Sequence, residues 1–311
     1  MSESARDAVI CEQAKIITGR HIIPISGKDS AATTLVQMAR EPSLPYEFLF
    51  CDVRMELPET YAWIDSLEVK LGIKIVRVGK SLEEVIADEG MLPSQKVRYC
   101  TREAKIFPLQ DYVGDDDVTQ YLGIRADESE RVGTMTKANI VPRYPLIEMG
   151  LGINHVYQIL THRGVMPPDF FWRRLYDAVV SRYPDLQPTA DGLPPWDRAA
   201  LFSWRSRSNC FMCFYQRRYE WVGLLEHHPE LFRRAEQMEI DYGSGDRREE
   251  GVQFGWIQGL PLSELRKRAV AIFDSRVRAV CRALSDIAQG KLFQDEFNPI
   301  TTVGCGLYCG K

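Results

Sequence analysis

The chain has 311 residues, of which 45% are hydrophobic and 26% charged, a composition typical of folded globular proteins. Its formal net charge of −4 excludes a basic field over the whole protein, although a local basic face remains compatible with that total. No run of about 18 apolar residues occurs and the first residues lack a signal-peptide core, so we expect a cytoplasmic protein without a membrane segment. In a reducing compartment, eight cysteines favour metal, cluster or redox chemistry over a disulfide framework.

The first predicted elements surround a candidate anion-binding loop. Residues 1–20 have a short helical pattern, and residues 21–35 then read as a strand, a tight Ser-Gly turn and a helix. Such a junction directs backbone N–H groups and the positive end of the helix dipole into one space, which suits phosphate or sulfate. Lys28 adds a point charge, and Ser26 and Ser30 add hydroxyl donors. An ordinary Ser- and Gly-rich turn is the alternative for this short motif.

Two further apolar runs, at residues 46–53 and 73–78, predict buried parallel strands. Between them a helix is expected to open at residues 57–63, where Pro58 is pre-organised and Glu59 favours the helix dipole. This alternation predicts an α/β fold with a mostly parallel, doubly wound sheet and with ligands at the carboxyl ends of the strands. Asp52, at the tip of the second strand, is placed either to hold a ribose hydroxyl or Mg²⁺ or simply to cap that strand.

Arg125 and Arg131 follow an apolar run at residues 121–124. Guanidinium groups at the end of a strand suit bidentate contacts with phosphate or sulfate oxygens. Because acidic residues lie between the two arginines, a solvated charge run is the alternative.

From about residue 142 the composition changes, because proline-containing loops separate short helical segments such as residues 154–160. We therefore divide the chain into an α/β domain at residues 1–140 and a helical, cysteine-containing region at residues 141–311, packed on the sheet. Aromatic and basic residues alternate at 215–221, where an amphipathic helix is favoured over a nucleic-acid contact. Residues 262–284 predict one long amphipathic helix with exposed arginines, among them Arg276.

The cysteines indicate a second site. Cys210 and Cys213 are separated by two residues, so a turn can direct both thiolates at one metal. Cys100 and the C-terminal pair Cys305 and Cys309 could complete a four-thiolate site for a [4Fe–4S] cluster or for zinc. A redox dithiol is less favoured, since its usual setting is the start of a helix in a thioredoxin-like unit. The remaining cysteines lie in apolar surroundings and are expected to be buried structural residues: Cys11, Cys51 and Cys281.

The segment Ser26-Gly27-Lys28-Asp29-Ser30 resembles the pyrophosphate-binding loop of the adenine nucleotide α-hydrolase-like (PP-loop) superfamily, Ser-Gly-Gly-Lys-Asp-Ser, with one glycine missing. Three later elements resemble, in family order, those of the phosphoadenylyl sulfate (PAPS) reductase family: 51–61 with Glu56-Leu57-Pro58-Glu59-Thr60-Tyr61, 98–109 with Cys100, and 123–131 with Gly123-Ile124-Arg125. The resemblance covers about residues 20–215 and implies that residues 1–140 form a PP-loop nucleotide-binding domain. It also implies the residues that bind ATP or adenylyl sulfate: Ser26, Gly27, Lys28, Asp29, Ser30, Asp52, Arg125 and Arg131.

Adenylyl sulfate reductases of this family hold a [4Fe–4S] cluster with a Cys-Cys pair, which matches Cys100-Thr101, and a later C-x₂-C, which matches Cys210 and Cys213. The resemblance therefore favours a cluster over zinc. Because Thr101 or Tyr99 stands where the partner cysteine would be, the fourth ligand is expected from Cys309 or Cys305, or one iron is left open toward the nucleotide. The tail 305–308 is also similar to the reductases' C-terminal motif, whose cysteine attacks the sulfate sulfur. Here Gly304 and Tyr308 replace its polar flanking residues, which argues against activation of the Cys305 thiol.

Two enzymatic functions fit these features. The first, which we favour, is an ATP pyrophosphatase that adenylates an acceptor for sulfur transfer, as in nucleic-acid thiolation or phosphorothioation. It would use Lys28, Asp29 and Arg125 with Mg²⁺, a nucleic-acid acceptor and a cysteine desulfurase as partner. The second is an adenylyl sulfate or phosphoadenylyl sulfate reductase with Cys305 as nucleophile and thioredoxin as partner. A non-catalytic nucleotide-binding subunit is an alternative of another class.

Overall fold

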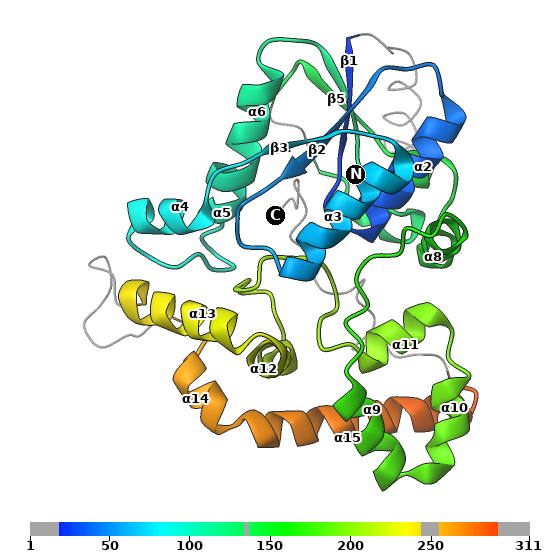
Figure 1. Ribbon diagram of the computed structural model, residues 1–311, viewed down its shortest axis with the longest axis vertical. Helices are drawn as coiled ribbons and strands as arrows, with labels where there is room; N and C mark the ends of the chain where they lie inside the picture. Colours follow the sequence, from blue (N-terminus) through cyan, green and yellow to red (C-terminus); the bar gives the residue numbers. More distant parts are fainter. Residues whose placement is uncertain (1–18, 134–136, 244–254, 292–311) are drawn as a thin grey trace.

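A five-stranded sheet forms the upper half of the computed structural model, which describes residues 19–133, 137–243 and 255–291 (Figure 1). The strands lie in the order β3-β2-β1-β4-β5, and each pairs in parallel with its neighbours. Their bounds are β1 (Arg20–Pro24), β2 (Tyr46–Cys51), β3 (Ile75–Val78), β4 (Val118–Tyr121) and β5 (Ile140–Arg143). The predicted α/β class and parallel, doubly wound sheet are therefore confirmed, whereas the helical pattern at 1–20 lies almost entirely outside the described residues.

Helices cover both faces of this sheet. Side chains alternate between the faces of a strand, so Ile23 packs in one apolar core and Ile22 in the other. The core containing Ile23 also holds residues of α2 (Lys28–Arg40), α3 (Pro58–Leu71) and α8 (Ile153–His162), and the core containing Ile22 holds residues of α6 (Phe107–Val113). The other elements of this half are short: α4 (Leu82–Glu89), α5 (Tyr99–Thr101), the π-helical turn η2 (Arg102–Ile106), the 3₁₀ turn η3 (Ala126–Arg131) and α7 (Pro145–Glu148).

The lower half of the molecule is helical (Figure 1). Its core contains Trp172, Trp221 and Val277 and continues into the segment that follows β2, where Val53 and Met55 are buried. One apolar core thus joins the helices to the carboxyl edge of the sheet. Its elements are α9 (Arg173–Arg182), η4 (Pro184–Leu186), α10 (Gln187–Asp191), α11 (Pro195–Phe202), α12 (Arg218–His227), α13 (Pro229–Tyr242), α14 (Leu262–Lys267) and α15 (Ala269–Ala288).

The long helix expected at residues 262–284 is interrupted at Arg268, which separates α14 from α15. The expectation that Arg276 is exposed was wrong, because it is 6% exposed and its guanidinium donates to the carbonyl oxygens of Ala200 and Leu201. Those carbonyls lie at the end of α11, where they have no partner within their own helix. Among the described residues, no helix combines the length and the hydropathy needed to cross a bilayer.

His21 gives the fold an acid-sensitive element. It is 4% exposed, its Nδ1 lies 3.0 Å from the Tyr121 hydroxyl, and burial lowers its pKa, with Arg143 acting in the same direction and Glu41 against it. The unfolded chain therefore takes up a proton at this position near pH 6.5, above the pH at which the folded chain does. Stability should consequently fall as the pH drops below about 6.5. Urea unfolding between about pH 7 and pH 5 should show a weaker pH dependence for His21→Gln than for the exposed-site control His162→Gln.

Candidate active site

The strand order creates one crevice at the carboxyl edge of the sheet. β1 pairs with β2 on one side and with β4 on the other, so the segments that follow β1 and β4 separate there. In open α/β sheets such a switch point is the usual position of a ligand. The loop at residues 25–27 leaves β1 and the loop at 122–125 leaves β4, and both line a cavity at this point. The topology therefore places the predicted phosphate loop where a ligand is expected.

Ser30 fixes the shape of the phosphate loop. Its Oγ accepts hydrogen bonds from the backbone N–H of Ser26 at 2.9 Å and of Gly27 at 3.1 Å, and donates to the carbonyl oxygen of Gly27 at 2.9 Å. Gly27 is the N-cap of α2, so the N–H groups that follow it have no partner within the helix. The N-terminus of a helix of 13 residues is thereby held open toward the cavity, which favours an anion.

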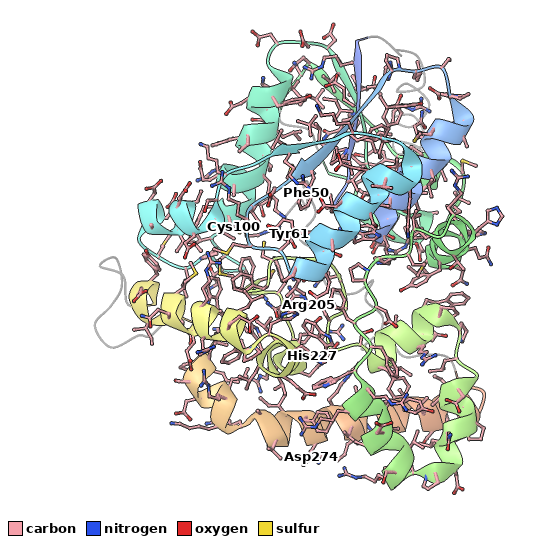
Figure 2. All side chains as sticks on the ribbon, in the orientation of Figure 1. Phe50, Tyr61, Cys100, Arg205, His227 and Asp274 are labelled. Atoms are coloured by element: carbon pink, nitrogen blue, oxygen red, sulfur yellow. The ribbon has the colours of Figure 1, made fainter. Side chains whose placement is uncertain are left out.

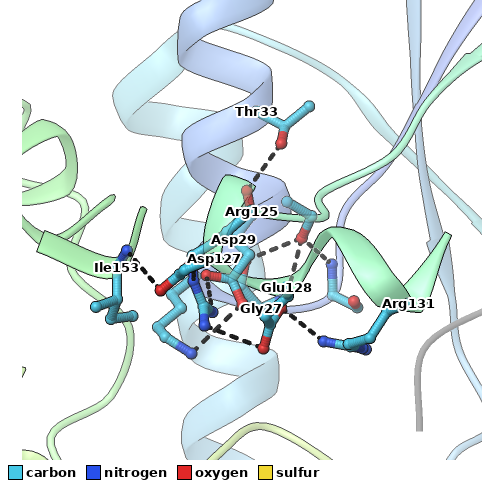
Figure 3. A network of polar contacts seen from close by, with 11 residues as sticks. Gly27, Asp29, Thr33, Arg125, Asp127, Glu128, Arg131 and Ile153 are labelled. Atoms are coloured by element: carbon cyan, nitrogen blue, oxygen red, sulfur yellow. Dashed lines mark hydrogen bonds and ion pairs between the residues drawn. The ribbon is translucent and has the colours of Figure 1, made fainter. Parts of the chain in front are cut away.

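Arg125 lies at the centre of a network of ion pairs (Figure 3). It is 2% exposed, and its guanidinium reaches Asp29 at 3.1 Å, Asp127 at 2.9 Å and Glu128 at 3.0 Å. Glu128 also pairs with Arg131 at 2.7 Å. Because α2 contributes Asp29 and η3 contributes Asp127 and Glu128, Arg125 links the two segments that border the crevice. This position suits Arg125 to holding the phosphate loop in place, and its direct contact with phosphate stays a prediction.

Lys28 lines the same cavity, with its Nζ 3.4 Å from an Asp29 carboxylate oxygen. Burial alone would raise the pKa of Asp29, but Lys28 and Arg125 together hold it below its usual value. The carboxylate is therefore ionised at neutral pH and neutralises part of the positive charge of the loop.

Gly123 allows the β4 loop to approach the phosphate loop closely. A Cβ at this position would lie 2.6 Å from the backbone nitrogen of Ser30. Gly123→Ala should therefore displace the phosphate loop and weaken nucleotide binding by about tenfold or more, since overpacking costs about 1–3 kcal/mol. Equilibrium binding of an ATP analogue would measure this loss. The melting temperature should also fall in Gly123→Ala but stay unchanged in Gly27→Ala, whose Cβ would meet nothing within 4 Å, so the pair separates overpacking from a general effect of removing a loop glycine.

The cavity has a volume of about 780 Å³ and lies between the sheet and the helical region. Its far side is formed by residues of α11 and by the segments before α9 and α12, including Trp196, Arg198 and Arg217. From the sequence, Trp196 and Arg198 had no expected role in a site, and Arg217 lay in the stretch 215–221, where a nucleic-acid contact was the less favoured alternative. Pro194-Pro195-Trp196 marked a helix start, but no spacing along the chain relates residue 198 to residue 28. Only the fold brings these side chains to one cavity.

Asp52 does not line this cavity. One of its carboxylate oxygens accepts hydrogen bonds from the Tyr61 hydroxyl and from the Arg54 N–H, both at 2.8 Å. Arg54 adopts a left-handed backbone conformation with φ of 58°, and the bond from its N–H to Asp52 supports this turn. The position of Asp52 matches the strand-capping alternative better than contact with a ribose.

Cys100, Cys210 and Cys213 line a second, small cavity of about 20 Å³ at the other end of the helical region. The Cys213 N–H donates to the Cys210 carbonyl oxygen at 3.1 Å, which closes the C-x₂-C turn. The structure thus brings three of the four predicted metal ligands together. Figure 2 shows Cys100 on the sheet side of the boundary between the sheet and the helical region. Cys305 and the fourth predicted ligand, Cys309, lie outside the described residues.

Charged groups surround this cysteine pocket. Arg205 is 1% exposed and donates to the carbonyl oxygens of Asn209 and Cys210, both at 2.6 Å, so it holds the C-x₂-C segment in place. Glu56 lies 3.8 Å from the Cys210 sulfur, and burial raises the pKa of its carboxyl group although Lys105 and Arg205 oppose this.

The three cysteines are therefore suited to a thiolate-bound metal by their chemistry, but not by their arrangement or by the volume of the pocket. Three soft sulfur donors match a cluster or zinc. Within the described part of the chain, however, no three His, Cys, Asp or Glu side chains are arranged to hold a metal ion. A cavity of about 20 Å³ has room for about one water molecule. As expected, Cys51 and Cys281 are buried, and burial raises the pKa of Cys51 to about 11.

Residues 20–147 match the model of the phosphoadenosine phosphosulfate reductase domain. This segment belongs to the PAPS reductase-like family of the PP-loop superfamily. Among its relatives, adenosine 5'-phosphosulfate reductase of Salinibacter ruber is 34% identical over 85 residues, which are 26% of this chain and 33% of that protein. An uncharacterised protein of Methanocaldococcus jannaschii is 26% identical over 210 residues, 66% of this chain and 44% of the relative. Another from the same organism is 29% identical over 112 residues, 35% of this chain and 23% of the relative.

The chain spans less than half of the length of these three relatives. Among solved structures, phosphoadenylyl-sulfate (PAPS) reductase from Candida auris in a phosphate complex aligns with a TM-score of 0.40 and 15% identity, over 54% of this chain and 89% of that one. The family inferred from the loop and the three later motifs is confirmed by the domain match.

Proposed function

We propose that this PAPS reductase-like protein is an ATP pyrophosphatase that adenylates an acceptor for sulfur transfer. The observation that carries the proposal is the cavity of about 780 Å³, which extends from the phosphate loop to the helical region. Ligand pockets measure about 300–1,000 Å³, so this cavity lies in the upper part of that range and leaves room for a nucleotide and part of an acceptor. Gly304 and Tyr308 stand in place of the polar residues that flank the reductases' cysteine, which supports a pyrophosphatase over a reductase that uses Cys305 as nucleophile.

In this proposal the acceptor oxygen attacks the α-phosphorus of ATP, and the bond between that phosphorus and the pyrophosphate oxygen breaks. Lys28 and the N-terminus of α2 would hold the negative charge that develops on the departing pyrophosphate. Mg²⁺ would arrive on the nucleotide phosphates, as it often does in phosphate sites. Arg125 would keep the two loops aligned, so that positioning and charge stabilisation supply the catalysis.

The cysteine pocket belongs to the same proposal. Cys100, Cys210 and Cys213 would supply the soft donors for a [4Fe–4S] cluster, with Cys309 or Cys305 as the fourth ligand and zinc as the alternative metal, and the pocket would have to widen beyond its volume of about 20 Å³ to bind it. When bound, a cluster would bind or relay sulfur for the second half of the reaction. Iron and acid-labile sulfide should be lost on changing Cys100, Cys210 or Cys213 to serine, whereas the buried Cys281→Ser should retain them. Normal iron content in all three variants would contradict the assignment.

Product analysis of the anaerobically purified protein tests the reaction type. Pyrophosphate and an adenylated acceptor should form from ATP and Mg²⁺ when total nucleic acid is supplied as acceptor, and AMP should be released once a sulfide donor is added. Sulfite release from adenylyl sulfate or phosphoadenylyl sulfate with thioredoxin, lost in Cys305→Ser, would instead identify a reductase. Measurable nucleotide binding with neither product would identify a non-catalytic subunit.

A further inference from the structure

The two sides of the large cavity differ in charge. On the sheet side, Lys28, Arg125 and Arg131 are each within ion-pair distance of a carboxylate. Those carboxylates belong to three residues, Asp29, Asp127 and Glu128, so the cations and anions balance. The side that carries the phosphate loop therefore has little excess positive charge of its own.

The opposite side carries two arginines that form no ion pair with the described residues, although Asp169 and Asp197 also line it. Arg198, in the first turn of α11, lies with its guanidinium carbon 4.7 Å from the centre of the Phe171 ring. Arg217 is the residue that precedes α12. Within the described part of the chain, neither guanidinium is within 4.0 Å of a carboxylate oxygen, and both line the cavity. Their positive charge is thus available to an anionic ligand.

The backbone around Arg217 is fixed by buried groups. Glu220 is 3% exposed and accepts hydrogen bonds from the N–H groups of Arg217 and Ser206, both at 2.7 Å. Burial alone would raise the pKa of Glu220, but Arg205 and these donors hold it below its usual value. Glu220 is therefore charged and keeps the start of α12 in place, and Figure 2 shows Arg205 at this junction between the two halves. Arg217 consequently projects from a preformed support.

An aromatic surface accompanies the two arginines. Trp196 is half-buried, lines the cavity and meets the Tyr157 ring edge-on at 6.2 Å between centroids. A partly exposed indole beside arginines is a combination that stacks a base while the guanidinium groups contact its phosphate. Arg198, Arg217 and Trp196 are called the basic wall below.

We propose that the basic wall binds a nucleotide unit of the acceptor, distinct from the adenine nucleotide at the phosphate loop. This inference rests on the proposed function, because it gives the acceptor a chemical class and a binding surface. The unit carries a phosphate for Arg198 and Arg217 and a ring for Trp196. A free mononucleotide and a nucleotide within a single strand share this chemistry.

Binding measurements with the phosphate loop already filled test the proposal. The protein is saturated with a non-hydrolysable ATP analogue, and affinity is measured for cytidine monophosphate and for a short single-stranded oligonucleotide. Arg198→Gln/Arg217→Gln should weaken binding of whichever probe the wild type binds by about tenfold or more, since a hydrogen bond to a charged group contributes about 1.5–3 kcal/mol. For the oligonucleotide, the negative slope of log affinity against log salt should become shallower by about 0.7 for each arginine removed. Arg218→Gln, at an exposed neighbour that does not line the cavity, should match the wild type.

The outcomes separate this proposal from the proposed function. Tighter binding of the oligonucleotide than of the mononucleotide identifies a strand as the source of the unit, and the reverse identifies a free nucleotide. If neither probe binds the wild type, or if the double variant binds them equally well, the basic wall is not an acceptor site. If the double variant instead loses affinity for the ATP analogue, its arginines serve the adenine nucleotide and the proposal is overturned. Failure of the wild type to bind the ATP analogue at all would reject the proposed function itself.

Discussion

Arg125→Met should lower the free energy of unfolding by about 3 kcal/mol or more, because removing one partner from a buried ion pair leaves uncompensated charge. Arg125 is 2% exposed and is shared by three carboxylates, of which Glu128 is 4% and Asp29 21% exposed. Asp29 and Glu128 would lose the cation that offsets their desolvation. Urea denaturation at neutral pH measures the effect as a shift of the midpoint. An unchanged midpoint would show that the network contributes nothing to stability.

Two related measurements separate the causes of this loss. Arg125→Lys keeps the charge but not the planar guanidinium that contacts three carboxylates, so its free energy of unfolding should lie between those of the wild type and the methionine variant. Asp29 adds a pH dependence, because its lowered pKa contributes stability that is present above about pH 4 and lost as the pH falls through the folded-state value. Since Arg125 is one of the two cations that lower this pKa, the acid-dependent loss should be smaller in Arg125→Met than in the wild type.

Lys28→Met should reduce pyrophosphate release from ATP by about 10²–10³-fold, the loss observed when one preorganised donor to a developing charge is removed. The fold should tolerate this change, since Lys28 is on the cavity surface and its contact with Asp29 is long, at 3.4 Å. Pyrophosphate release should therefore fall, while the melting temperature stays close to that of the wild type. This prediction depends on the proposed function, whereas the Arg125 prediction does not.

The exposed Lys74 provides the matched control for Lys28. It lies just before β3, at the amino edge of the parallel sheet, and so at the end opposite the phosphate loop. Lys74→Met should retain both pyrophosphate release and stability. Equal losses in the two variants would indicate a general effect of removing a lysine, and full activity in Lys28→Met would reject its assigned role.

Much of the fold was predictable because its signals are local. The apolar runs around residues 23, 49 and 76 correspond to buried parallel strands, and the Ser-Gly turn before Lys28 does open a helix. The C-x₂-C turn likewise needs only adjacent residues to form. Two boundaries were less accurate: the strand expected at 121–124 ends at Tyr121, and α14 and α15 are separate at Arg268.

The sequence by itself determined the α/β architecture, the phosphate loop and the family, because strand periodicity and turn chemistry are properties of neighbouring residues. Only the tertiary structure decided what the charged side chains do. Arg125 and Arg217 look alike in a sequence, yet one is buried among three carboxylates, and the other lines a cavity with no carboxylate oxygen of the described residues within 4.0 Å of its guanidinium. Pairing of charges depends on which distant segments the strand order and the shared apolar core bring together. The spacing of residues along the chain does not encode the distances between those side chains.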